Sequence, residues 1–314
     1  MFAPADYERV IELRNQANPT RLVSVAQLTE EDARRSTGQD LWARFVAERG
    51  QDVPGFGEAG HIPGAPPRRF RVFVTVAHGS REEGLGSALL AAAENWALSR
   101  GAQGYLTAYV SGDDDDSLAW AEHRGYGLDL ERSEAVLDLG TWNAGGFAGH
   151  LDSVRTAFGP GFEMVIAEEP LSEGLLRGAY EVELSASRDE PSYEGEAPSW
   201  DEWRREFGQP ASPKLMAIAL AEGRVVGTSQ VTLPVEPDVK AGAHTNFTGV
   251  LRDYRGRGLA LALKLLTIEA VRARGISTMT ATNDSANRPM LSLNRKLGYR
   301  IVPGPRRLKK ALRT

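Results

Sequence analysis

A basic, glycine-rich stretch carries the clearest chemistry in this sequence. It reads TGVLRDYRGRGLALA from Thr248 to Ala262 and contains three arginines, of which Arg257 lies between two glycines. A β-type run ending at Val250 leads into this turn, and a helix is expected from about Arg257. A helix start presents backbone N–H groups without an intrahelical partner together with the positive end of the helix dipole. The stretch therefore predicts an anion-binding site.

Two other glycine-loop motifs fit this stretch less well. A phosphate-binding Walker A loop needs Gly-Lys-Ser or Gly-Lys-Thr, which is absent here. A dinucleotide-binding fingerprint needs a third glycine and an acidic residue about 20 positions further on. Leu261 stands where that third glycine is needed, and Glu269 comes too early to be the acidic residue. A glycine-bearing helix start that binds no ligand remains the plain alternative.

The six residues Arg255 to Ala260 fit the pattern Arg/Gln-x-x-Gly-x-Gly/Ala. This stretch resembles the loop that binds the pyrophosphate of acetyl-CoA in the GNAT superfamily of N-acetyltransferases. The surroundings strengthen the resemblance, because a strand precedes the loop and an amphipathic helix, a strand, a helix and the closing motif Leu297-Gly298-Tyr299 follow it. The resemblance implies an α/β fold with a mixed α+β sheet and acetyl-CoA as cosubstrate. The positions that it assigns to acetyl-CoA are Thr248, Gly249, Val250, Arg255, Gly256, Arg257, Gly258, Leu259, Ala260, Asn283 and Asn287.

An internal repeat supports the same interpretation. Residues 80–101 align without a gap on residues 254–275, which pairs Arg81 with Arg255, Gly84 with Gly258 and Gly86 with Ala260. The apolar positions of the two segments coincide on one helix face. We therefore predict a duplication into two tandem GNAT acyl-CoA N-acyltransferase domains. The predicted parts are an N-terminal domain at 1–140, a linker at 141–160 and a C-terminal domain at 161–314.

The N-terminal copy carries a weaker counterpart of the loop. Val76, Arg81, Gly84 and Gly86 are its candidate residues for binding CoA. Its turn also holds two glutamates, Glu82 and Glu83, and like charge opposes the binding of a pyrophosphate. We expect catalysis in the C-terminal copy and a weak or structural site in the N-terminal one. The stretch from Glu134 to Leu139 is expected to close the first sheet.

The resemblance also implies how the donor is held. In this family a bulge in the strand before the loop separates two parallel strands, the pantetheine arm lies in the gap, and backbone N–H groups face the thioester. The Val250 N–H is our candidate oxyanion donor. His244 lies six residues before Val250, which places both side chains on one face of a regular strand, so His244 is a candidate base. A structural histidine is the plain alternative.

One position departs from the family pattern. Many members carry a tyrosine four residues before the glycine of the closing motif, and it protonates the leaving thiolate. Asn294 occupies that position here, and Ala121 occupies it in the first copy. Asn294 can still hydrogen-bond the thiolate sulfur. Asn283 and Asn287 are expected to order the CoA arm, with helix capping as the alternative.

Composition limits the other classes. The chain has 314 residues, a net charge of −5, no cysteine and five histidines without a metal-ligand spacing. These features argue against nucleic-acid binding, exclude disulfides and predict no metal. No apolar run reaches the length of a membrane span, and the charged N-terminus is not a signal peptide, so we expect no membrane contact and a cytoplasmic location.

The predicted function is transfer of an acetyl group from acetyl-CoA to a primary amine of a small molecule, by direct attack of the neutral amine. The protein is expected to act as a monomer or a homodimer. Glu194 and Glu196, in an acidic loop, are possible contacts for a cationic substrate. Two alternatives remain open: a CoA-binding sensor or scaffold with little turnover, and a protein or peptide N-acetyltransferase.

Overall fold

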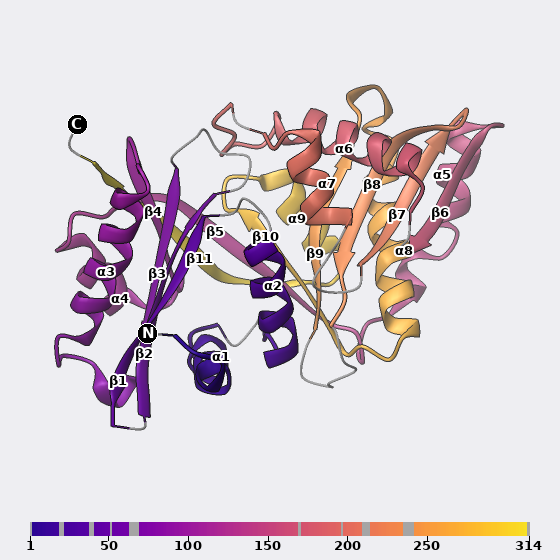
Figure 1. The fold of residues 1–314 in the computed structure, drawn as a ribbon. Helices are drawn as coiled ribbons and strands as arrows, with labels where there is room; N and C mark the ends of the chain where they lie inside the picture. The colour runs from indigo at the N-terminus through magenta and orange to yellow at the C-terminus, as the bar shows by residue number, and fades with distance from the viewer. Residues whose placement is uncertain are drawn as a thin grey trace. The chain divides into compact units, whose positions relative to one another are not determined.

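The fold consists of two compact units. A computed structural model describes residues 2–18, 22–37, 41–50, 52–62, 69–168, 171–195, 197–208, 214–234 and 242–312. Unit 1 comprises Met1–Arg132 and Pro303–Thr314, and unit 2 comprises Ser133–Val302. Each unit holds a mixed sheet with helices packed against it (Figure 1), which confirms the predicted α/β class.

Unit 1 has a five-stranded sheet in the order β1-β2-β3-β4-β11, in which only β3 and β4 are parallel. Its elements are η1 (Pro4–Asp6), α1 (Tyr7–Ala17), α2 (Val25–Thr37), β1 (Trp42–Arg49), β2 (Asp52–His61), β3 (Phe70–Val76), η2 (His78–Ser80), α3 (Leu85–Ser99), β4 (Tyr105–Val110), α4 (Asp115–Glu122) and parts of β5 (Gly127–Asp138) and β11 (Arg300–Ala311). Apolar residues of α3, such as Leu90 and Ala93, pack on the strands with Phe70 and Leu106.

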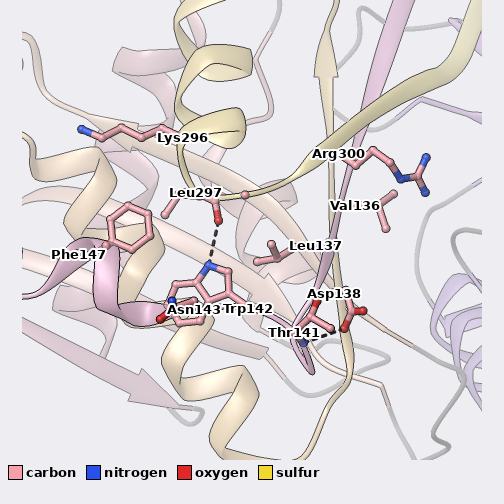
Figure 2. A pocket seen from close by; sticks show the side chains of 12 residues that line it. Val136, Leu137, Asp138, Thr141, Trp142, Asn143, Phe147, Lys296, Leu297 and Arg300 are labelled. Atoms are coloured by element: carbon pink, nitrogen blue, oxygen red, sulfur yellow. Dashed lines mark hydrogen bonds between the residues drawn. The ribbon is translucent and has the colours of Figure 1, made fainter.

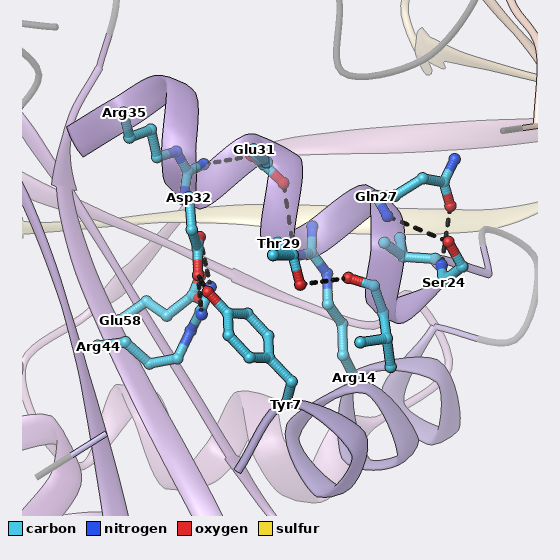
Figure 3. Close-up of polar contacts among 12 residues, drawn as sticks. Tyr7, Arg14, Ser24, Gln27, Thr29, Glu31, Asp32, Arg35, Arg44 and Glu58 are labelled. Carbon is cyan, nitrogen blue, oxygen red and sulfur yellow. Dashed lines mark hydrogen bonds and ion pairs between the residues drawn. The ribbon is translucent and has the colours of Figure 1, made fainter. Parts of the chain in front are cut away.

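A buried charge network joins helices α1 and α2 to the sheet of unit 1 (Figure 3). The side chain of Arg44, on β1, is 0% exposed, and its guanidinium donates to Asp32 of α2 at 2.5 Å and to Glu58 of β2 at 2.6 Å. The hydroxyl of Tyr7, on α1, donates to the same Asp32 carboxylate at 2.8 Å. Because a buried charge is costly without a partner, each member of this network holds the others in place.

Unit 2 has a six-stranded sheet in the order β5-β10-β9-β8-β7-β6, and β9 and β10 run parallel. Its elements besides parts of β5 and β11 are η3 (Ala144–Phe147), α5 (His150–Phe158), β6 (Phe162–Glu168), α6 (Glu173–Ser187), α7 (Trp200–Gly208), β7 (Lys214–Ala221), β8 (Arg224–Thr232), β9 (Ala243–Val250), η4 (Arg252–Tyr254), α8 (Leu259–Ala273), β10 (Thr278–Asp284) and α9 (Arg288–Lys296).

Helices cover both faces of the unit 2 sheet. On one face, Leu259 and Leu263 of α8 pack with Val226 and Val250 of the strands. On the other face, apolar residues of α6 and α7 pack against alternating strand residues such as Ile218. Figure 1 shows α6 and α7 in front of the orange strands and α8 behind them.

The last strands of the two halves are exchanged, which the sequence did not indicate. Glu134–Leu139 was expected to close the first sheet, but Ser133–Asp138 of β5 belongs to unit 2, where β5 lies next to β10. In return, the C-terminal part of β11 pairs antiparallel with β4 in unit 1, with Arg306 opposite Val110. The boundaries of the two units therefore differ from the ranges 1–140 and 161–314 that were predicted for the domains. Those domain ranges stay a prediction.

Candidate active site

A gap opens between the two parallel strands of unit 2. Among the described residues, register pairs join β9 to β10 only at Ala243, His244 and Thr245, the last of them opposite Ala281. Beyond this point β9 continues to Val250 and β10 continues to Asp284 without such pairs. The two strands therefore separate at the end that leads into the glycine-rich turn.

A β-bulge lies where this separation begins. Opposite β8, Gln230 pairs with Phe247 and Val231 pairs with Thr245, so Asn246 is an extra residue in β9. The Asn246 side-chain oxygen accepts hydrogen bonds from the backbone N–H and the hydroxyl of Thr232, at 3.2 and 2.8 Å. A bulge bends its strand and changes its twist, which accounts for the divergence of β9 from β10.

Two backbone N–H groups of β9 face the gap. The Leu251 N–H donates to the carbonyl of Val226 in β8 at 2.9 Å. In an antiparallel pair every second residue points its N–H toward the partner strand, and the residues between point theirs away. Following that alternation back along β9, the N–H groups of Val250 and Thr248 point away from β8, on the side where β10 has separated. They are donors suited to an extended ligand.

The turn after β9 is shaped for close approach to an anion. Gly256 and Gly258 have φ angles of 76° and 79°, in the left-handed region. A Cβ atom at Gly256 would have no neighbour within 4 Å, so the space in front of this backbone is open. Helix α8 begins at Leu259 and its N-cap is Gly258, so no side chain caps the free N–H groups. The helix starts two residues later than predicted because Gly258 departs from helical geometry.

The arginines of the turn are held by the protein itself. Arg255 donates from Nε to the Val250 carbonyl and from Nη1 to the Asp189 carboxylate, both at 2.7 Å. Arg252 contacts both oxygens of the same carboxylate. Hydrogen bonds from Arg252 and Arg255 lower the pKa of Asp189 to about 2. The third arginine, Arg257, lies with its guanidinium 5.0 Å from the ring centre of Phe158.

The turn before α3 in unit 1 has the same backbone conformation as the turn before α8, but it carries different charges. Glu82 occupies the position of Gly256 with a φ of 67°, and Gly84 occupies that of Gly258 with a φ of 82° before helix α3. Among the residues that the structure describes, β3 and β4 pair at two positions, both before Val76, so these strands separate as well. The N–H of Ala77 donates to Pro54, the counterpart of the Leu251 bond. The duplication is therefore confirmed in the backbone.

Side-chain interactions also occupy the first turn. Glu83 forms an ion pair with Arg49, and Arg81 lies 3.8 Å from the carboxylate of Asp114. A Cβ atom at Gly86 would come within 3.3 Å of Trp120. These contacts leave the first turn with two carboxylates at positions where the second has glycine and arginine.

The geometry of β9 contradicts the premise on which His244 was chosen. The bulge at Asn246 shifts the alternation, so the even spacing from His244 to Val250 no longer places them on one face. Val250 packs with α8. The neighbour of His244, Ala243, packs on that same face, so His244 points to the opposite one. There its Nδ1 lies 2.8 Å from the Thr280 hydroxyl. His244 therefore lies on the α6 side of the sheet, and its role as a base stays a prediction.

The predicted asparagines lie on β10 and α9, on one side of the gap. Asn294, on α9, is 0% exposed, and its Nδ2 donates to the side-chain oxygen of Asn283 on β10 at 2.8 Å. Asn287 is the N-cap of α9, and its side-chain oxygen accepts from the Met290 N–H at 3.2 Å. Asn287 therefore caps a helix, as the plain alternative proposed.

Sequence reasoning missed a buried polar cluster on the α6 side of unit 2. The Glu183 carboxylate of α6 accepts from the indole N–H of Trp203 at 2.8 Å and from the side-chain amide of Gln230 at 2.9 Å. Only the i, i+3 and i+4 periodicity of α6 hinted that Glu183 faces inward. Of the acidic-loop residues suggested as substrate contacts, Glu194 has partners within the protein, and Glu196 lies outside the described residues.

A separate pocket of about 770 Å³ lies at the C-terminal end of α9 in unit 2 (Figure 2). Trp142, Phe147, Lys296 and Arg300 are among the residues that line it, and the Trp142 indole donates to the Leu297 carbonyl at 2.9 Å. None of the predicted site residues lines this pocket. It is therefore distinct from the gap and the basic turn.

Comparisons with known proteins agree with this geometry. The sequence model of the acetyltransferase (GNAT) family matches residues 8–126 and again residues 179–299. A tandem GNAT protein from the clavulanic acid biosynthesis pathway, solved without AcCoA, has a TM-score of 0.78 at 20% identity over 98% of this chain and 94% of that one. A GCN5-related N-acetyltransferase from Sphaerobacter thermophilus has a TM-score of 0.65 at 22% identity over 100% of this chain and 95% of that one. The comparison with curated proteins finds no match.

At these identities the two structures support the fold alone. No helix in the described ranges combines the length and the apolar character that crossing a membrane requires.

Proposed function

Because the chain belongs to the acetyltransferase (GNAT) family, we propose that unit 2 transfers an acetyl group from acetyl-CoA to a primary amine of a small molecule. The observation that carries this proposal is the separation of β9 and β10 beside the basic turn. It places the outward N–H groups of Thr248 and Val250 next to the open N-terminus of α8. An extended arm ending in a diphosphate fits this combination of features.

The donor would be held at two places. The diphosphate would bind the backbone N–H groups from Arg257 to Ala260 at the start of α8, where the helix dipole favours negative charge. The pantetheine arm would extend β9 through the N–H groups of Thr248 and Val250, and acetyl-CoA supplies the activated thioester. We assign the Val250 N–H to the oxygen of the thioester as negative charge develops there. A hydrogen-bond donor aimed at this developing charge lowers the activation free energy by about 3 kcal/mol.

The acceptor would approach from the α6 side of the sheet. An alkyl ammonium group has a pKa near about 10, so the amine must lose a proton before or during its attack on the carbonyl carbon. His244 faces this side with Thr280, and the Glu183 carboxylate lies on the same side, bonded to Gln230. Placing amine and thioester together contributes most of the remaining acceleration.

The two units differ in their suitability for this reaction. Unit 2 has Gly256 in the open part of the turn, where unit 1 has Glu82. In unit 1 the helices on the corresponding side of the sheet are joined to it by the buried Arg44–Asp32 ion pair. A carboxylate beside a diphosphate raises the free energy of binding by repulsion, which favours unit 2 as the catalytic unit.

A sensor or scaffold with little turnover is the second candidate. Asn294 and Ala121 favour it, because neither unit has the family's tyrosine at that position. The test is thiol release from acetyl-CoA with a panel of primary amines, diamines and peptides. Amine-dependent release supports the transferase. A tight acetyl-CoA complex that releases no thiol with any amine supports the sensor, and release with peptides alone supports a peptide acetyltransferase.

A further inference from the structure

Three polar side chains are buried on the α8 side of unit 2. Lys264 is 1% exposed, Tyr299 is 3% exposed and Thr245 is 5% exposed. Within the described part of the chain, the hydroxyl groups of Tyr299 and Thr245 form no hydrogen bond. The Lys264 ammonium lies 5.2 Å from the centre of the Tyr299 ring. Burial alone, with no acidic neighbour to offset it, lowers the pKa of Lys264 to about 8.

This arrangement is absent from the equivalent positions of unit 1. Leu90 stands where unit 2 has Lys264, and the helix there buries an apolar side chain. Tyr126 stands where unit 2 has Tyr299, and its hydroxyl donates to Glu94 at 2.8 Å. Leaving a polar group buried without a partner costs free energy that an apolar residue would avoid. The uncompensated polar groups are therefore a feature of the copy that carries the basic turn.

These groups converge on the closed end of the gap. Thr245 is the last residue of β9 that pairs with β10, and its hydroxyl lies near that of Tyr299 without a hydrogen bond between them. Asn294 of α9 bonds to Asn283 of β10, which follows the last paired residue Ala281, and its own side-chain oxygen has no partner among the described residues. A ligand that fills the gap would thus meet polar groups that the protein does not satisfy.

We propose that Tyr299 is the proton donor to the leaving sulfur, with Lys264 as the cation that supports it. This inference rests on the proposed function of unit 2 as an acyltransferase. The acceptor nitrogen bonds to the thioester carbon, and the carbon–sulfur bond breaks with its electron pair remaining on sulfur. The Tyr299 O–H gives its proton to that sulfur and forms the thiol. The Lys264 ammonium, 5.2 Å from the centre of the ring, stabilises the resulting tyrosinate, and the proton lost by the acceptor nitrogen reaches the Tyr299 oxygen through solvent and restores its O–H.

Two variants test this assignment, Tyr299→Phe and Lys264→Leu, the latter introducing the residue of unit 1. Both remove an unsatisfied polar group, so we expect melting temperatures equal to or above that of the wild type. We expect acetyl-CoA affinity within about twofold of wild type and a kcat lower by about 100-fold, the effect of losing a general acid. The matched control is Tyr126→Phe in unit 1, which should leave kcat unchanged.

A binding measurement makes the test independent of turnover. Calorimetry with CoA and with desulfo-CoA, which lacks the sulfur, reports contact with the sulfur directly. We expect the wild type to bind CoA more tightly than desulfo-CoA, and both variants to bind the two ligands equally. Wild-type kcat in either variant, or a preference for CoA that survives both substitutions, would overturn the assignment. If the wild type released no thiol with any amine but kept its preference for the sulfur, only the proposed acyl transfer would fail.

Discussion

Arg255 and Asp189 form an ion pair at 2.7 Å, although the arginine belongs to the turn that we assign to a diphosphate. Carboxylate and phosphate oxygens accept bidentate hydrogen bonds from guanidinium groups in the same geometry. Asp189 also binds Arg252, so a single carboxylate engages two of the three arginines in the turn. An incoming diphosphate must compete with this carboxylate.

The first prediction concerns this competition. Asp189→Asn should strengthen acetyl-CoA binding several-fold, because it removes the anion that holds Arg252 and Arg255. Asp253→Asn is the matched control, since Asp253 is an exposed carboxylate in the same turn. It should change affinity less, because salt screens the charge of an exposed side chain. Weaker binding of acetyl-CoA by the Asp189 variant would instead identify this carboxylate as a support for the arginines.

The second prediction uses the buried amine of Lys264. Its pKa is about 8 in the folded protein and about 10.5 in the unfolded chain. Between these values the unfolded chain binds more protons, so the unfolding free energy rises with pH from about 8 upward, and the full penalty persists below pH 8. The shift corresponds to about 3 kcal/mol.

Lys264→Leu should therefore raise the unfolding free energy at pH 7 by up to about 3 kcal/mol and remove the rise between pH 8 and pH 9.5. Urea denaturation of both proteins across that range measures the difference. A variant that is less stable than the wild type at pH 7 would show that the amine has a partner that stabilises its charge.

The third prediction concerns the buried network of unit 1 shown in Figure 3. Asp32→Asn leaves Arg44, whose side chain is 0% exposed, with one charged partner fewer. Removing one partner of a buried pair costs about 3 kcal/mol or more. Glu31→Gln is the control, because its partners, Arg35 on the same helix and Arg14 on α1, are partly exposed and such pairs contribute less than about 1 kcal/mol. Chemical denaturation measures both, and equal effects would count against a buried network.

The glycine-rich turn was the part of the site that could be predicted best from the sequence. A glycine-bearing turn followed by an apolar helix period is a local signal, and it located the start of α8 within two residues. The repeat then placed the corresponding positions of unit 1 without any long-range information. Gly258 has a further role that only the fold shows, since a Cβ atom there would come within 2.9 Å of His150.

The pairing of strands that are far apart in the sequence could not be predicted from local sequence patterns. No residue type marks Asn246 as a bulge, yet this one extra residue reverses the face on which His244 lies relative to Val250. The exchange of β5 and β11 depends on which strand pairs with β4, and local patterns do not encode that choice. The burial of Lys264 could not be predicted from sequence either, because it depends on how α8 packs against the sheet.

Calorimetric titration of acetyl-CoA into Gly256→Glu, with Glu82→Gly as its reciprocal, tests the assignment of the turn most directly. Glu82 adopts a φ of 67° at the matching position, so glutamate is compatible with this backbone and the variant should remain folded. We predict that Gly256→Glu loses acetyl-CoA binding at unit 2, while Glu82→Gly keeps it. Wild-type affinity in Gly256→Glu, or a loss that appears only in the Glu82 variant, would contradict binding of the donor at the turn before α8.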